Sequence, residues 1–191
     1  MNYIKVSAIL LAAGVSERMG RDKLLLDYRG KSLLWHSFDL LCALPVFERI
    51  VVTSNARAES LALPAEIKLC INTKRKHGMS ESVRIGVENA TGSHFLFLNA
   101  DQPKLGVADI MPLLETAKTN PDKIIFPLID SKPSSPTIFP QGFRSELLSL
   151  SGDLGGRVVR NRNPDACLAI EADASENFYD IDTEEEYRGL F

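Results

Sequence analysis

The chain has 191 residues, a length that fits one domain, because domains most often hold roughly 100 to 150 residues. With 45% hydrophobic and 25% charged residues, the composition is that of a globular protein and excludes the disordered, collagen-like and disulfide-scaffold classes. The 22 Lys and Arg against 25 Asp and Glu give a formal net charge of -3. We therefore expect no global basic field, and neither nucleic acid nor a membrane surface as a partner.

The cysteine pattern and the N-terminal segment predict a cytoplasmic protein. Cys42, Cys70 and Cys167 are far apart, odd in number and never paired at a zinc spacing. This pattern favours buried thiols in a reducing compartment over disulfides or a zinc site. The apolar run at 6–13 is followed by charged residues from Glu17 onward, far short of the ~20 apolar residues that a membrane span needs.

The first two thirds of the chain alternate short apolar runs with amphipathic, helix-like stretches. In chain order these segments are 6–13, 32–44, 49–54, 67–71, 80–90, 94–100 and 107–118. Continuous runs of Val, Ile, Leu and Phe between amphipathic helices are typical of a parallel sheet that is buried on both faces. The sequence therefore predicts an α/β protein with three layers, α/β/α, around a mostly parallel, Rossmann-like sheet.

After Asn120 the pattern is looser. Residues 123–129 predict another strand, residues 131–140 are interrupted by three prolines, and residues 143–150 and 155–161 predict short helices. We expect this part of the chain to add edge strands and a lid. Because no repeat, linker or low-complexity segment marks a boundary, we expect residues 1–191 to form a single domain.

The loop after the first strand suits a nucleoside triphosphate. In open α/β sheets, ligands bind beyond the carboxyl ends of the strands. The segment LAAGVSERMGRDK, at 11–23, ends the strand in small residues and then places arginines and a lysine on a loop. Small side chains let backbone amides approach a ligand closely, and the cations can hold its phosphates.

Two familiar phosphate-binding motifs do not fit this loop. Counted from Gly14, the G-x-G-x-x-G motif requires a glycine where Ser16 stands. The G-x-x-x-x-G-K-[ST] motif requires a glycine and then a lysine where Met19 and Gly20 stand. A Rossmann dinucleotide site and a Walker P-loop are therefore disfavoured, and a glycine turn with solvated charges is the plain alternative.

The full spelling L-A-A-G-x-S-x-R-M-G-x-x-K resembles the signature loop of the MobA-like NTP transferases, which wraps the triphosphate. Further segments that resemble elements of that family are HGMSESVRIG at 77–86, LNADQP at 98–103, GDLGGR at 152–157 and YDIDTEEEY at 179–187. The resemblance implies the fold of the nucleotide-diphospho-sugar transferases. Within the family, LAAG, DQP and GD-x-G-x-R are most similar to the molybdenum cofactor cytidylyltransferases.

The resemblance implies nucleotide-binding residues on the first loop and around the start of the helix after Gly78. These residues are Leu11, Ala12, Ala13, Gly14, Ser16, Arg18, Lys23, Gly78, Ser80 and Ser82. It implies catalytic roles for Arg18, Lys23 and Asp101. For the acceptor it points to Asp153, and to Ser135 in a loop where the usual G-x-P of the family is replaced by Ser-Ser-Pro.

Three aspartates are candidate metal ligands. Asp101 directly follows an apolar strand, and Mg²⁺ usually takes one or two carboxylates plus substrate phosphates. Asp180 and Asp182 are two residues apart in FYDIDT and would share one face of a strand, so both could face the ion. The resemblance favours Asp182 as the second ligand, with Asp180 as the alternative.

The implied reaction is attack by a substrate phosphate on the α-phosphorus of a nucleotide, with release of pyrophosphate. A phosphomonoester has its second pKa at about 6, so the nucleophile is largely a dianion at pH 7 and needs no general base. We expect Mg²⁺-dependent transfer of CMP from CTP, or of another NTP's nucleotidyl group, to a molybdopterin-type phosphorylated acceptor. A molybdoenzyme would be the delivery partner. The alternatives are a related transferase that uses GTP or another phosphorylated acceptor, and a non-catalytic cofactor-binding chaperone.

Overall fold

The computed structural model describes residues 4–14, 19–59, 61, 63–74, 78–173 and 175–191. Its main sheet has eight strands, which are β1 Val6–Ala12, β4 Glu48–Thr53, β5 Ile67–Ile71, β6 His94–Asn99, β7 Ile124–Ile129, β8 Lys132–Pro133, β9 Thr137–Pro140 and β10 Cys167–Glu171. The path through the sheet is β10-β7-β9-β6-β1-β4-β5, and β8 pairs with β7. The strands β2 Asp27–Tyr28 and β3 Lys31–Ser32 form a separate small hairpin.

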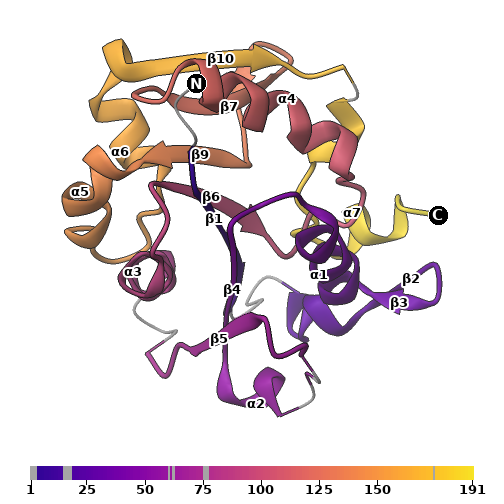
Figure 1. Ribbon diagram of the computed structural model, residues 1–191. Coiled ribbons are helices and arrows are strands. Elements are labelled where there is room, and N and C mark those ends of the chain that lie inside the picture. Colours follow the sequence, from indigo (N-terminus) through magenta and orange to yellow (C-terminus); the bar gives the residue numbers. More distant parts are fainter. Residues whose placement is uncertain (1–3, 15–18, 60, 62, 75–77, 174) are drawn as a thin grey trace.

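Helices cover both faces of the sheet (Figure 1). The α-helices are α1 Leu33–Ala43, α2 Asn55–Ala58, α3 Met79–Asn89, α4 Val107–Thr119, α5 Arg144–Leu148, α6 Arg157–Arg162 and α7 Glu184–Arg188. Residues of α1 and α4 pack on one face, whereas residues of α3, α5 and α6 pack on the other. The expected three-layer α/β/α architecture is confirmed.

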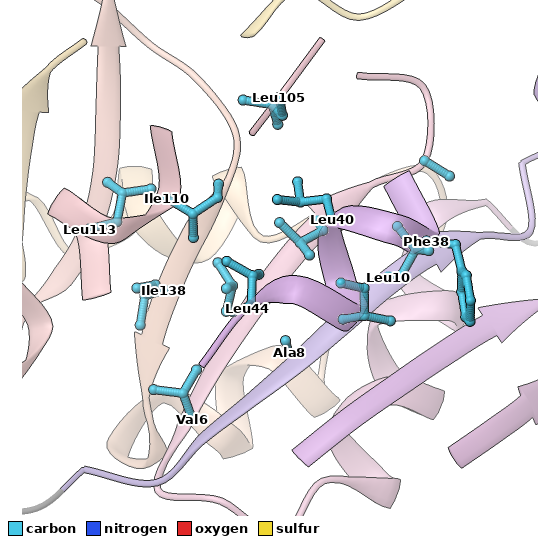
Figure 2. Packing of buried hydrophobic residues seen from close by; sticks show 14 of the residues in the cluster. Val6, Ala8, Leu10, Phe38, Leu40, Leu44, Leu105, Ile110, Leu113 and Ile138 are labelled. Carbon is cyan, nitrogen blue, oxygen red and sulfur yellow. The ribbon is translucent and has the colours of Figure 1, made fainter. Parts of the chain in front are cut away.

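Alternation along β1 explains why both faces carry a core. Ala8 and Leu10 point into the cluster that holds α1 and α4, while Ile9 between them belongs to the cluster of the opposite face. Figure 2 shows the first of these clusters, with Phe38 and Leu40 of α1 close to Leu10. Because all three β1 side chains are fully buried, the strand reads as a continuous apolar run.

One strand lies where the sequence did not place it. The proline-rich segment was expected to add an edge, but β9 lies between β6 and β7 and is antiparallel to both. Its Ile138 and Phe139 are completely buried. Pro136 precedes the strand and Pro140 ends it, so neither removes a hydrogen bond from the middle of the ladder.

Two smaller expectations were also wrong. The segment 179–182 is not a strand but an irregular stretch between a 3₁₀ turn and α7. All three cysteines are free, but only Cys70 is buried, while Cys42 is exposed on α1 and Cys167 is half-buried. Within the described ranges, we find no helix with the length and apolar character of a membrane span.

The topology brings three loops to one edge of the sheet. β1, β4 and β6 are parallel neighbours, and Leu11 pairs with Asn99 while Ala12 pairs with Thr53. The chain therefore leaves β1, β4 and β6 at the same edge of the sheet, the one formed by the carboxyl ends of these strands, where ligands of open α/β sheets bind.

Candidate active site

A lysine and two aspartates meet at this edge. The Lys23 ammonium donates to Asp101 Oδ2 at 2.7 Å and to Asp182 Oδ1 at 2.7 Å. The side chain of Lys23 is 12% exposed, that of Asp101 20% and that of Asp182 30%, so the cluster is largely but not completely buried. The structure thus brings together three residues that lie up to 159 positions apart in the sequence.

Backbone contacts explain how these residues meet. Asp101 lies just beyond β6, whose exit is fixed by the Ala100 N–H donating to the Leu11 carbonyl at 3.3 Å. The Ile181 N–H donates to the Asp101 carbonyl at 2.9 Å, which brings the segment before α7 alongside. The Ile181 side chain is buried against Tyr28 and Leu33, so this segment is held by an apolar anchor between its two aspartates.

The cluster has a clear electrostatic balance. Burial by itself would lower the pKa of Lys23, but the charges and hydrogen bonds of Asp101 and Asp182 outweigh it and raise that pKa above 10.5. Asp180 also lies near these aspartates and hydrogen-bonds to Asn99. Asp180 is exposed as a residue, but partial loss of hydration at its carboxylate, and then the negative charges of Asp101 and Asp182, raise its pKa to about 7. Three carboxylates around one ammonium leave an excess of negative charge.

Replacing Asp180 by Asn should therefore change stability in a pH-dependent way. Because the folded protein holds the Asp180 proton more tightly than the unfolded chain, this residue lowers stability as the pH rises from about 4 toward 7. We expect the melting temperature of Asp180→Asn in EDTA to exceed that of the wild type at pH 8, and by a clearly smaller margin at pH 5, because the penalty grows from about pH 4 to pH 7. Calorimetry at both pH values is the measurement.

Asp165→Asn is the matched control, because Asp165 is an exposed acid outside the cluster. Asp165→Asn should leave the difference between the melting temperatures at pH 5 and pH 8 the same as in the wild type. An Asp180→Asn protein that melts at or below the wild-type temperature at pH 8 would show that repulsion within the cluster does not reach the folding equilibrium.

The carboxylates suit a divalent cation that arrives with phosphates. Asp101 Oδ1 is buried and has no hydrogen-bond partner among the described residues. A buried carboxylate oxygen without a donor is costly, and a cation would satisfy it. Across the residues that the structure describes, no three His, Cys, Asp or Glu side chains form a ready metal cage. Mg²⁺ usually keeps waters and phosphates beside one or two carboxylates, so Asp101 and Asp182 are enough carboxylates for such an ion.

A buried arginine, which the sequence analysis missed, holds the loop after β1. Arg57 of α2 is 3% exposed and donates to Asp22 through Nε and Nη2, both at 2.7 Å. It also donates to the Ala12 carbonyl at 2.6 Å and the Gly14 carbonyl at 2.8 Å. The only signal in the sequence is the position of Arg57, shortly after a strand that neighbours β1.

The start of α3 is tied to the loop at 152–153. Gly78 has a φ of +86°, and a Cβ there would collide with the Gly152 carbonyl, so only glycine fits. Ser80 Oγ donates to that carbonyl at 2.6 Å, and the Met79 N–H donates to Asp153 Oδ1 at 3.3 Å. These contacts give Gly78, Ser80 and Asp153 a structural role in joining the two loops.

The remaining predicted residues are placed as follows. Ala12 and Ala13 are buried, and Gly14 is exposed, with open space where a Cβ would stand. Ser82 is buried and accepts from Asn72 Nδ2 at 2.9 Å. Ser16 and Arg18 lie outside the described residues.

Ser135, a residue predicted to bind the acceptor, contacts Gln102, which the sequence analysis did not single out. The Ser135 carbonyl is 3.5 Å from Gln102 Nε2. Gln102 is 1% exposed and donates to the Phe178 carbonyl at 2.6 Å, which helps to hold the segment before Asp180. The ligand-binding roles of Ser135, Asp153, Gly78, Ser80, Ser82 and the loop residues stay predictions.

A family model for the MobA-like NTP transferase domain matches residues 8–167. The chain belongs to this family. The match begins in β1 and extends to β10, so it includes the loop after β1, Asp101 and the 152–153 loop. The family resemblance seen in the sequence is confirmed.

Curated relatives of this chain carry several different names. Nicotine blue oxidoreductase of Paenarthrobacter nicotinovorans is 30% identical over 97% of this chain and 96% of its own length. Purine catabolism protein PucB of Bacillus subtilis is 27% identical over 94% and 92%. The probable molybdenum cofactor guanylyltransferase of Rhodopirellula baltica is 32% identical over 61% and 58%, so this chain matches little more than half of that relative. The chain is thus a nucleotidyltransferase-family protein related to the guanylyltransferases.

Solved structures share the fold. Rv0371c of Mycobacterium tuberculosis has a TM-score of 0.80 and 22% identity, covering 99% of this chain and 98% of its own. A nucleotidyl transferase of Methanothermobacter thermautotroptrophicus has a TM-score of 0.80 and 20% identity, covering 97% and 95%. A manganese complex of Rv0371c has a TM-score of 0.78 and 19% identity, covering 97% of each chain. The expected nucleotide-diphospho-sugar transferase fold is confirmed.

Proposed function

We propose that this chain, acting as a single domain in the cytoplasm, transfers CMP from CTP to a molybdopterin-type phosphorylated acceptor and releases pyrophosphate. The observation that carries the proposal is the cluster of Lys23, Asp101 and Asp182 beside the loop after β1. An oxygen of the acceptor phosphate forms a bond to the α-phosphorus. The bond from that phosphorus to the bridging oxygen breaks, and pyrophosphate leaves with the electron pair.

The residues of the site would do positioning and electrostatic work rather than proton transfer. At neutral pH the attacking phosphate is already largely a dianion, so no base is required. Two anions must approach each other while charge builds on the leaving group, and fixed cations lower that barrier. Lys23 would turn from the aspartates to the phosphates of the nucleotide, and the loop amides near Gly14 would hold the triphosphate.

We propose Mg²⁺ as the metal, held by Asp101 and Asp182. When bound, it would neutralise charge on the reacting phosphates. The unpaired Asp101 Oδ1 supports this assignment from within the chain. The manganese bound to a structure of the same fold supports a divalent ion. Asp180 is the alternative second ligand.

GTP is the second candidate donor, because several relatives over about 60% of the chain are named guanylyltransferases. The two relatives that match nearly the full chain carry other names, and one is called an oxidoreductase, so names do not choose the donor. A pyrophosphate-release assay with each NTP, with and without a molybdopterin-type acceptor, tests the proposal. If none of the NTPs gives pyrophosphate release although the protein is folded, a cofactor-binding chaperone is favoured.

CTP is expected to be the better donor because β1 leads into two alanines, Ala12 and Ala13, rather than into a second glycine. Ala12 and Ala13 are 0% and 2% exposed, and the methyl group of Ala13 takes space that a second glycine would leave for a purine. One methyl group typically discriminates by roughly 1 to 3 kcal/mol, or about 10- to 200-fold, so kcat/KM for CTP should exceed that for GTP by this range. Ala13→Gly should reduce the ratio in steady-state competition.

The matched control is Ala8→Gly, which removes a buried methyl group from the same strand away from its carboxyl end. This variant should lose stability without changing the CTP to GTP ratio. Equal kcat/KM for the two nucleotides in the wild type would overturn the cytidylyl assignment while leaving nucleotidyl transfer in place.

A further inference from the structure

The loop after β1 is held at both of its ends by one side chain. The Arg57 guanidinium reaches the Ala12 and Gly14 carbonyls at the start of the loop and the Asp22 carboxylate at its end. Asp22 Oδ1 also accepts from the Leu24 N–H at 3.2 Å and so caps the 3₁₀ turn Lys23–Leu25. Arg57 is thereby connected, through Asp22, to the turn whose first residue is Lys23.

Only a guanidinium has the shape for this set of contacts. Two parallel donors, Nε and Nη2, face the two oxygens of Asp22, while Nη1 and Nη2 point toward carbonyls on the other strand of the loop. Arginine carries five donors in a rigid planar fork, whereas the ammonium of lysine is a point charge with three donors. A lysine at this position would keep the charge but could not hold both ends of the loop together.

The pairing also has an electrostatic consequence. Asp22 stands directly before Lys23, in the loop where a triphosphate would bind, and its negative charge would repel the phosphates. The bidentate bond from the buried Arg57 neutralises that carboxylate and satisfies both of its oxygens. Arg57 itself is 3% exposed, so its guanidinium faces the interior of the protein rather than a ligand.

We infer that Arg57 is a positioning residue for nucleotidyl transfer: it ties Ala12 and Gly14, where the loop after β1 begins, to Asp22, where it ends, and through Asp22 it fixes the place of Lys23. This inference rests on the proposed function. It assigns Arg57 no contact with the substrate. Its effect on the reaction comes from the geometry of the loop, where a displacement of about 1 Å can cost on the order of 100-fold in rate.

The test compares Arg57→Lys with a matched arginine elsewhere. Arg49 of β4 also donates from Nε and Nη2 to two carbonyls, those of Leu41 and Leu44, but at the opposite edge of the sheet. Arg57→Lys should lower kcat/KM for the nucleotide about 10- to 100-fold, with KM for the acceptor unchanged. Arg49→Lys should lower the melting temperature without changing either KM.

Two further measurements separate this inference from the proposed function. Amide hydrogen exchange of residues 12–14 and 19–24 should become faster in Arg57→Lys and stay at the wild-type rate in Arg49→Lys, with no ligand present. Asp22→Asn, which leaves Arg57 in place, should lower nucleotide kcat/KM by a similar factor. It is the substitute test in case Arg57→Lys does not fold. A wild-type protein that neither binds nor turns over any NTP would contradict the proposed function, and with it the positioning role.

Unchanged exchange in the loop of Arg57→Lys, or an equal loss of nucleotide kcat/KM in Arg49→Lys, would overturn the positioning role alone. The double variant Arg57→Lys with Asp22→Asn adds an internal check. Because both changes break the same contact, their combined loss should be clearly smaller than the product of the single losses. Losses that multiply fully would mean that the two residues act independently.

Discussion

Asp101→Asn is expected to remove most nucleotidyl transfer while leaving the fold intact. The substitution keeps the size of the side chain but removes the anionic ligand at the end of β6. Loss of a cation that stabilises the transferring phosphates is worth several kcal/mol, so we expect at least on the order of 100-fold lower kcat/KM at limiting Mg²⁺. The measurement is pyrophosphate release over a range of Mg²⁺ concentrations.

A second readout does not depend on turnover. Asp101→Asn should weaken the binding of Mn²⁺ to the nucleotide-free protein, and electron paramagnetic resonance measures this binding. Asp122→Asn is the control, because Asp122 is an exposed acid just before β7, at the opposite edge of the sheet. Asp122→Asn should keep the wild-type rate and metal affinity. An Asp101→Asn enzyme with the wild-type rate at limiting Mg²⁺ would refute the assignment of Asp101 as a metal ligand.

The strands that were predicted well are those whose side chains are buried on both faces. For β1, β4 and β6 the predicted bounds lie within one residue of the observed ones, because a continuous apolar run has few places to end. β9 was assigned to an edge because its prolines suggested interruption. Its place in the middle of the sheet depends on pairing with β6 and β7, which no local pattern encodes.

The site was predicted from sequence motifs and from their positions after predicted strands, not from contacts between side chains. Asp101 and Lys23 stand in loops that follow neighbouring strands, so their meeting follows from the topology once β1 and β6 are parallel. Asp182 reaches them from an irregular segment, held by the burial of Ile181 and not by strand geometry. Arg57 could not be found in this way, because an isolated arginine in a polar segment looks the same whether it is solvated or buried.

Lys23→Ala is expected to have opposite effects on catalysis and on metal binding. For catalysis, removing one preorganised donor to the phosphates should cost roughly 2 to 4 kcal/mol of transition-state stabilisation. The variant should also bind CTP less tightly, because the lysine contacts the triphosphate before the reaction. Steady-state kinetics and calorimetric titration with CTP measure the two losses. Lys31→Ala, at an exposed surface pair with Asp39, is the control and should change neither.

For metal binding the expected sign is reversed, because the Lys23 ammonium lies 2.7 Å from both proposed ligands, Asp101 and Asp182. Its positive charge occupies the place between the carboxylates, so a metal ion must displace it before both carboxylates can bind the ion. Without the lysine, the nucleotide-free protein should bind Mn²⁺ more tightly while turning over more slowly. The wild type would then take up its metal mainly together with the triphosphate, since the phosphates draw Lys23 away as the ion arrives. Weaker Mn²⁺ binding in Lys23→Ala would show that the lysine supports the metal site instead of competing with it, and unchanged CTP affinity and turnover would remove Lys23 from the site.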